Sequence, residues 1–171
     1  MFVTMNHYET PIACRGAALC SSRLRRGRDI TQTIKDMYAS TLNAMKNAKT
    51  KDDIQILVNG MDVPEWVGIS PAGETRTRAE TLASLEPLLA IPPEERPTPT
   101  LDFLYFKETG WNVLAVYWVY RQSEHQMVGS LVRDTWVRTA LGLRRIRHEK
   151  FFPDRVLVDD GKPLVLPPHK N

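Results

Sequence analysis

The sequence predicts a single α+β domain in which three helices precede one curved, antiparallel sheet. Helical periodicity is confined to the first half of the chain, and from Thr100 the pattern changes to apolar segments separated by short turns. Short turns join antiparallel neighbours, whereas parallel strands need long crossover connections. A length of 171 residues, with 42% hydrophobic and 25% charged residues, fits one domain with one core.

The first two helices are marked by a capping signal and a stop signal. Asp29 is a suitable N-cap, and the apolar residues that follow it at helical spacing predict a helix over 30–48. A shorter helix is expected over 52–58, because Asn59-Gly60 is a strong stop signal.

An early strand is expected over 64–70, and a third helix follows it. Thr77 with Glu80 three residues later is a capping box that opens this helix. Pro87 lies within the leucine repeat and is expected to bend or shorten the last turn.

The second half of the chain predicts a four-strand meander over 100–108, 111–122, 126–138 and 143–152. The strand over 111–122 is apolar on both faces, so both should be covered. The helices cover one face. A second copy of the chain is the simplest cover for the other, which predicts a homodimer, although the chain ends are an alternative cover.

The two ends of the chain differ from the predicted domain, which spans 29–152. Residues 1–28 carry a net charge of +4, which leaves −1 for the rest, and they predict a disordered basic leader. Both cysteines, Cys14 and Cys20, lie in this leader, so a disulfide framework is excluded from the domain. Four prolines over 153–171 predict an irregular C-terminal tail.

Charge and hydropathy exclude several classes of partner. No stretch approaches the eighteen apolar residues typical of a membrane span, so no membrane partner is expected. The basic pI comes from the leader rather than from the domain, which argues against nucleic acid as a partner. The leader has no convincing signal peptide, so a cytoplasmic location is expected.

Two segments resemble known proteins. The segment 134–149, with a basic residue after Trp136-Val137, a turn at Gly142 and His148 on the returning strand, is similar to the closing hairpin of SnoaL-like proteins. Residues 38–44, Tyr-Ala-Ser-Thr-Leu-Asn-Ala, resemble the first helix of ketosteroid isomerases. Together with the element order over 29–152, these segments resemble the nuclear-transport-factor-2-like superfamily. That resemblance implies a cone-shaped fold, often dimeric, with one deep pocket.

The resemblance to ketosteroid isomerases also implies roles for three residues. Tyr38 falls where these enzymes place the tyrosine of their oxyanion hole, and Asp134 falls near the acid that donates the second hydrogen bond there. Their catalytic base is an aspartate before a proline, and here Ser70 precedes Pro71. Serine without a partner base cannot take a proton from carbon, which argues against steroid isomerase chemistry.

Asp134, His148 and Tyr38 are the candidate catalytic residues. If Asp134 and His148 pair across the closing hairpin near the pocket, the carboxylate would orient the imidazole for acid–base chemistry. The alternative is a structural ion pair between neighbouring strands. Tyr38 is either a donor to a ligand carbonyl or a core tyrosine with a satisfied hydroxyl.

Four further residues are candidates for ligand binding: Trp66, Trp118, Tyr120 and Asp62. The aromatic residues are expected either to line an apolar pocket or to belong to the core, and Asp62 is either at the pocket mouth or a loop carboxylate. The basic strand over 144–150 offers an arginine for an anionic group of a ligand.

The chain contains no phosphate loop, dinucleotide fingerprint, nucleophile elbow or His-x-x-x-His pair, so neither a metal nor another cofactor is expected. Two functions fit these observations. The first is a cofactor-independent acid–base enzyme acting on a small apolar substrate by isomerisation, cyclisation, dehydration or epoxide hydrolysis. The second is a non-catalytic module for ligand binding or dimerisation.

Overall fold

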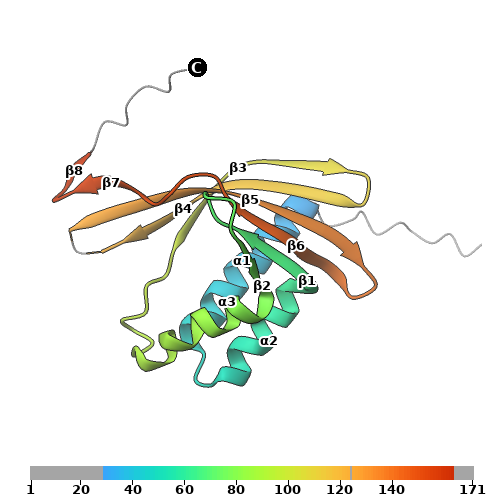
Figure 1. Cartoon of the computed structure of the whole chain (residues 1–171), viewed down its shortest axis with the longest axis horizontal. Coiled ribbons are helices and arrows are strands. Elements are labelled where there is room, and N and C mark those ends of the chain that lie inside the picture. The colour runs from blue at the N-terminus through green and yellow to red at the C-terminus, as the bar shows by residue number, and fades with distance from the viewer. Residues whose placement is uncertain (1–28, 124, 164–171) are drawn as a thin grey trace, which may run out of the picture.

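Three helices lie against one face of a curved sheet in the computed structural model of the chain (Figure 1). The structure describes residues 29–123 and 125–163. The predicted leader, residues 1–28, therefore lies outside the described residues.

Helix α1 (Ile30–Asn47) begins where the capping signal predicts. The carboxylate of Asp29 accepts a hydrogen bond from the Thr31 backbone N–H at 3.0 Å. Ile34 and Tyr38, four residues apart on one side of the helix, are its buried residues. This spacing fixes which side of α1 faces the sheet.

Helix α2 (Lys51–Met61) is longer than the sequence predicts. It opens with a capping box between Thr50 and Asp53. The expected stop at Asn59-Gly60 is wrong, because the helix continues through both residues to Met61. Met61 is buried in the core, and its packing overrides the weak helix propensity of glycine.

Helix α3 (Arg78–Leu85) confirms the capping box of Thr77 and Glu80. Its side chain–backbone hydrogen bonds run in both directions, at 3.2 Å and 2.7 Å. The chain then tightens into the 3₁₀ helix η1 (Glu86–Ala90), with Pro87 near its start. Pro87 thus shortens the α-helix as expected, since proline offers no backbone N–H.

The predicted four-strand meander is present as β3 (Thr100–Thr109), β4 (Asn112–Gln122), β5 (Gln126–Thr139) and β6 (Gly142–Lys150). The early strand β1 (Asp62–Ile69) and a short strand β2 (Thr75–Thr77) complete the main sheet, in the order β2-β1-β6-β5-β4-β3. Every pairing is antiparallel except that of β1 with β6, which is parallel. The sheet is therefore mixed and mostly antiparallel.

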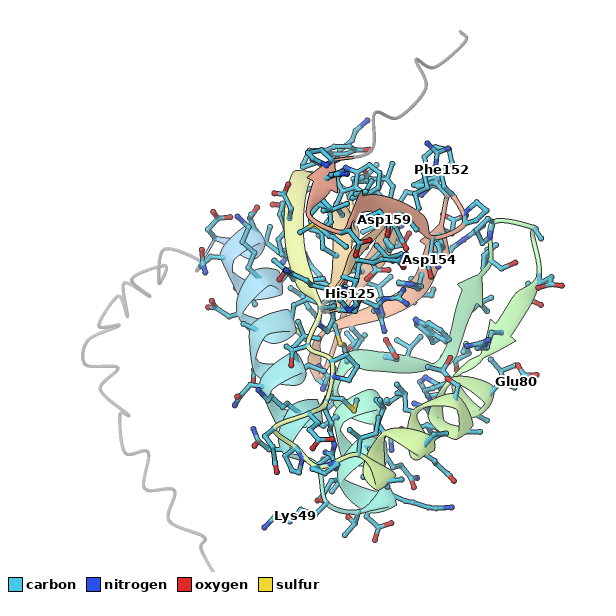
Figure 2. All side chains as sticks on the ribbon, turned by 90° about the vertical axis from the view of Figure 1, so that its left-hand side faces the viewer. Lys49, Glu80, His125, Phe152, Asp154 and Asp159 are labelled. Carbon is cyan, nitrogen blue, oxygen red and sulfur yellow. The ribbon has the colours of Figure 1, made fainter. Side chains whose placement is uncertain are left out.

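The segment 153–163, expected to be irregular, instead contains strands β7 (Arg155–Asp159) and β8 (Lys162–Pro163). β7 pairs with the first part of β5, where β6 does not reach. This pairing satisfies backbone groups at an otherwise open strand edge. Figure 2 shows Asp154 and Asp159 of this region at the opposite end of the molecule from Lys49.

The main core lies between α1 and the concave face of the sheet. Its buried residues include Ile34 and Tyr38 from α1, Val113 and Tyr117 from β4, and Trp136 from β5. A second apolar cluster joins α2 to α3 around Ile54 and Val58. Among the described helices, none combines the length and apolar character that a membrane crossing requires.

Candidate functional site

The strand register places the two main candidate residues on neighbouring strands and on one face. Asp134 on β5 stands opposite His148 on β6, and His148 stands opposite Gly68 on β1. Side chains of directly opposed residues point to the same face of a sheet. Asp134 is fully buried on the concave face with Val132 and Trp136, as the alternation along β5 predicts.

A β-bulge brings a further basic side chain to this face. The pairing of β5 with β6 shifts between Thr135 and Trp136, so that Ile146 is the extra residue on β6. Arg145 and His148 are three residues apart and would point to opposite faces of a regular strand. The bulge lets both reach the same carboxylate, that of Asp134.

Asp134 accepts hydrogen bonds from four side chains. His148 Nδ1 lies 2.7 Å from Oδ1, while the Tyr117 hydroxyl at 2.8 Å and Arg145 at 3.1 Å donate to Oδ2. The Tyr38 hydroxyl also donates to Oδ2. These donors come from α1, β4 and β6, so the carboxylate ties three elements to β5.

The charges around Asp134 keep its carboxylate ionised. Burial alone raises the pKa of Asp134, but the Arg145 and His148 charges and the hydrogen bonds hold that pKa well below its usual range. Burial and the Asp134 charge raise the pKa of Tyr38 and of Tyr117 well above the ordinary value. The two hydroxyls are therefore neutral donors to a charged acceptor.

Asp62 forms a second contact with the same arginine. It stands opposite Arg145 in the parallel pairing, and its two oxygens accept hydrogen bonds from Arg145 at 2.8 Å and 3.2 Å. Asp62 is 3% exposed. Burial raises the pKa of Asp62, and the attraction of Arg145 only partly offsets this.

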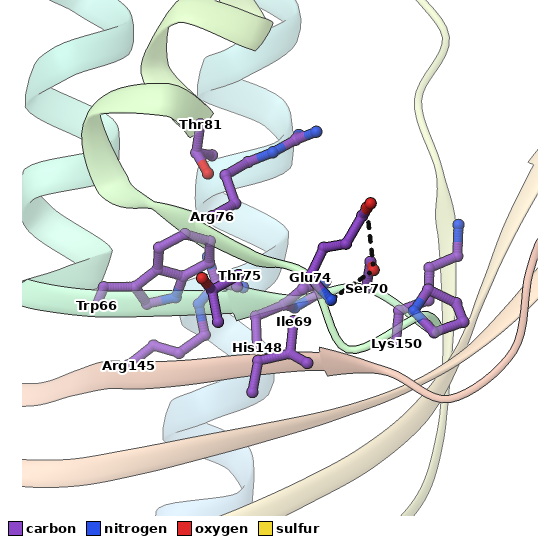
Figure 3. A pocket seen from close by; sticks show the side chains of 12 residues that line it. Trp66, Ile69, Ser70, Glu74, Thr75, Arg76, Thr81, Arg145, His148 and Lys150 are labelled. Atoms are coloured by element: carbon purple, nitrogen blue, oxygen red, sulfur yellow. Dashed lines mark hydrogen bonds between the residues drawn. The ribbon is translucent and has the colours of Figure 1, made fainter.

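A pocket of about 450 Å³ opens beside this network, between β1, β2, α3 and β6. Figure 3 shows Arg76 and Thr81 above Trp66 in this view, with Arg145 and His148 below it on β6. A volume of this size suits a small organic molecule. His148 is 31% exposed at its side chain and joins the pocket to the buried carboxylate of Asp134.

Trp66 forms an apolar wall of this pocket over a glycine. A Cβ at Gly68 would lie 2.7 Å from the Trp66 ring, so the indole occupies the space that a side chain at Gly68 would need. The guanidinium of Arg145 lies 5.5 Å from the Trp66 ring centroid. Trp66 is 4% exposed, and the predicted ligand-binding position is in the pocket lining.

The other predicted site residues lie elsewhere. Tyr38 is behind the pocket, where its hydroxyl meets Asp134, and Asp62 is buried against Arg145 rather than at the pocket mouth. Trp118 and Tyr120 stack on each other, with ring centroids 6.1 Å apart. They alternate with the core residue Tyr117 on β4 and therefore belong to the convex face, away from this pocket.

Ser70, at the position where ketosteroid isomerases carry their base, lines the pocket but serves the turn after β1. Its hydroxyl accepts hydrogen bonds from the Ala72 and Glu74 backbone N–H groups at 3.3 Å and 3.2 Å. Asp134 differs too, because an ionised carboxylate accepts hydrogen bonds and cannot donate one to an oxyanion. The site thus lacks two features that the resemblance to these enzymes implies.

The sequence did not identify three residues of this site: Arg145 and Tyr117 in the network, and Arg76 in the pocket lining. Tyr117 shares its strand face with Val113 and looks like a core residue. Arg145 is one of several arginines on a basic strand, and only the bulge turns its side chain toward Asp134. Within the described part of the chain, no group of three or more His, Cys, Asp or Glu residues has the spacing to hold a metal ion.

No family model matches the sequence. No curated protein matches it either. Comparison with solved structures, in contrast, finds many of similar fold.

The chain has the nuclear-transport-factor-2-like (NTF2-like) fold. It is similar to an NTF2-like protein from Cytophaga hutchinsonii, with a TM-score of 0.52 and 14% identity over 72% of this chain and 98% of that one. An NTF2-like protein with a cystatin-like fold from Novosphingobium aromaticivorans has a TM-score of 0.53 and 19% identity, over 70% of this chain and 79% of that one.

The protein Aln2 from a Streptomyces species is also similar, with a TM-score of 0.52 and 18% identity over 71% of this chain and 89% of the other. Identities this low establish the shared fold and leave the activity to be argued from the site.

Proposed function

We propose that this protein binds a small apolar molecule in the pocket beside Trp66 and that His148 exchanges a proton with it. The observation that carries the proposal is the contact of His148 Nδ1 with Asp134 Oδ1 at 2.7 Å, at the boundary between the pocket and the buried network. A carboxylate that orients an imidazole facing a ligand is a recurring acid–base arrangement.

The tautomer of His148 follows from the charge of Asp134. Because an ionised carboxylate only accepts hydrogen bonds, the proton of the neutral imidazole must be on Nδ1. Nε2 then carries the lone pair and is the ring nitrogen available to a ligand in the pocket. In this arrangement Asp134 and Tyr38 are positioning residues, since they reach the ligand only through His148. Arg145 also holds Asp134 in place, but its side chain lines the pocket itself.

The proposal is tested by NMR of ring ¹⁵N-labelled histidine combined with a substrate screen. We expect the Nδ1–H tautomer at His148, and turnover of small apolar carbonyl compounds, enols or epoxides that His148→Gln abolishes. His125→Gln, on the turn after β4, is the matched control. The Nε2–H tautomer, or turnover that survives His148→Gln, would refute the acid–base role.

A non-catalytic module for ligand binding or dimerisation is the second candidate. The turn role of Ser70 favours it, because no carboxylate occupies the place of the catalytic base that ketosteroid isomerases carry there. The convex face supports a homodimer, since Tyr105, which stands opposite Val116, is 51% exposed there. If pocket ligands bind and none is converted, this candidate is the better account.

A further inference from the structure

We infer that the ligand of this pocket is a flat, largely apolar acid, with its anionic group at Arg76 and a polar group at His148. The inference rests on the proposed function, because it assumes that a ligand occupies the pocket beside His148. It adds the chemical class of that ligand and a residue that selects it.

Arg76 belongs to the same row of the sheet as the proposed acid–base pair. Across four neighbouring strands the row runs from Arg76 on β2 through Gly68 on β1 and His148 on β6 to Asp134 on β5, and each residue stands directly opposite the next. Directly opposed side chains share a face, so Arg76 and His148 both extend from the concave face. Gly68 between them contributes no side chain, and the indole of Trp66 lies in that space.

This row sets the separation between the two polar ends of the ligand. Neighbouring strands are about 4.8 Å apart, so the backbones of Arg76 and His148 are separated by roughly 10 Å. The Trp66 ring fills the space over Gly68 between them, and Ile69 and Pro71 are further apolar residues of a lining that also contains polar side chains. A fused aromatic or similarly flat body spans such a distance and stacks against an indole.

The charge inventory of the lining identifies Arg76 as the anion-binding residue. Arg145 is paired with Asp62 and Asp134, and Lys150 is paired with Asp154. Arg76 has no carboxylate within 4.0 Å in the part of the chain that the structure describes.

The two nearby acidic residues are engaged by other groups. Glu80 accepts hydrogen bonds from Thr77 at 2.7 Å and 2.8 Å, and Glu74 accepts one from Ser70 at 3.5 Å. Hydrogen bonds from Thr77 and, to a smaller extent, the charge of Arg76 lower the pKa of Glu80, so Arg76 attracts this carboxylate. Arg76 forms no ion pair with a described residue, so its donors remain for a ligand, and a carboxylate matches their planar geometry.

The test uses two probes of similar size and shape, the anionic 6-hydroxy-2-naphthoate and its neutral amide, 6-hydroxy-2-naphthamide. Each has a flat body, and the hydroxyl at one end is a partner for His148. Affinities are measured by quenching of tryptophan fluorescence, and the His148 ring resonances in NMR report whether a probe occupies the pocket. We expect the naphthoate to bind about five-fold more tightly than the amide, a modest ratio because Arg76 is exposed and water screens its charge.

Arg76→Gln is the test variant, and Arg138→Gln, an exposed arginine on β5, is its matched control. Arg76→Gln should equalise the two affinities while leaving the amide unchanged, and Arg138→Gln should preserve the five-fold ratio. Equal binding of both probes to the unmodified protein, or a preference that persists in Arg76→Gln, overturns the inference and leaves the pocket function intact. If neither probe shifts the His148 resonances, the proposed function fails together with the inference.

Discussion

Asp134 on β5 and His148 on β6 face each other, with Oδ1 of the carboxylate 2.7 Å from Nδ1 of the imidazole, and the two side chains differ sharply in exposure. The carboxylate is fully buried, whereas the imidazole reaches the pocket. Asp134 can therefore orient His148 without contacting a ligand itself. This division makes the effects of the two residues on stability and on function separable.

Replacing Asp134 with asparagine should destabilise the fold strongly. The change leaves Arg145 with only Asp62 as a counter-charge and replaces one of the two acceptor oxygens by an NH2 donor that faces other donors. We therefore expect a loss of about 3–5 kcal/mol in the free energy of unfolding. Urea denaturation followed by circular dichroism measures this. Asp102→Asn, at an exposed position on β3, should cost less than about 0.5 kcal/mol. Equal effects of the two variants would contradict the network.

The stability of the protein should fall in acid. The pKa of Asp134 is depressed in the folded state, so its stabilising contribution is fully present above the unfolded pKa of about 3.9 and is lost as the pH falls through the folded value. Asp62 has a raised pKa, so it acts in the opposite sense, and stability gains slightly as the pH falls toward its unfolded pKa.

Urea midpoints measured between pH 7 and pH 2.5 test this balance. We expect little change or a slight rise toward pH 4 and a steep decline below it. Asp62→Asn should remove the slight rise and keep the decline. A midpoint that stays constant down to pH 2.5 would show that Asp134 is not stabilised as a carboxylate.

Tyr38 and Tyr117 should show strong coupling in a double-mutant cycle. Both hydroxyls donate to Asp134 Oδ2, and they lie 3.1 Å from each other. Each single change to phenylalanine should cost about 1.5–3 kcal/mol, because the acceptor is charged. We expect the double variant to differ from the sum by at least about 0.5 kcal/mol. Additive losses in chemical denaturation would indicate two independent hydrogen bonds.

Arg96 should stabilise the end of helix α1 from outside the helix. It is 7% exposed and donates hydrogen bonds to the backbone carbonyls of Lys46 at 2.9 Å, Ala48 at 2.6 Å and Ile91 at 2.8 Å. Arg96→Met leaves these carbonyls without a donor, and we expect a loss of about 2–3 kcal/mol.

Hydrogen exchange provides the readout for Arg96→Met. The amide protons of the last turn of α1 should exchange faster, while those of β4 and β5 change only with the global stability. Arg121→Met, at an exposed position, is the control. Unchanged protection at the end of α1 would show that the helix does not depend on this side chain.

The proposed homodimer is tested at Tyr105 on the convex face. Its exposed side chain stands opposite the buried Val116, so an interface on this face would include it. We expect the unmodified protein to sediment as a dimer and Tyr105→Arg to sediment as a monomer with a similar circular dichroism spectrum. The control is Glu94→Arg, in the loop before β3, which should remain a dimer. Lys107 would not serve as a control position, because its side chain lies on the same face as that of Tyr105. A monomeric unmodified protein would refute the proposal.

Local signals in the sequence predicted most of the fold. The cap at Asp29, the capping box at Thr77 and the glycine turns of the meander act over a few residues, and the structure contains all of them. The strand β7 was missed because Pro153 and Pro163 outweighed the apolar residues between them. The turn at Asp160-Gly161, where both residues have positive φ, was the overlooked signal.

The candidate site was harder to predict than the fold. The pairing of Asp134 with His148 followed from their places on a hairpin, and the structure brings them together. No local sequence signal predicts the parallel pairing of β1 with β6, because helix α3 and the strands β2 to β5 separate these two strands in the sequence. Without that pairing, neither the contact of Asp62 with Arg145 nor the position of Arg76 could be derived.

The parallel pairing also has a consequence for folding kinetics. Asp62 and Arg145 are 83 residues apart in the sequence, so their contact closes a long loop, and its entropic cost must be met before the contact forms. The hairpins of the meander close much shorter loops and should form earlier. We therefore expect the pocket to be among the last features to form during folding, and a nascent chain to lack it until β6 has been synthesised.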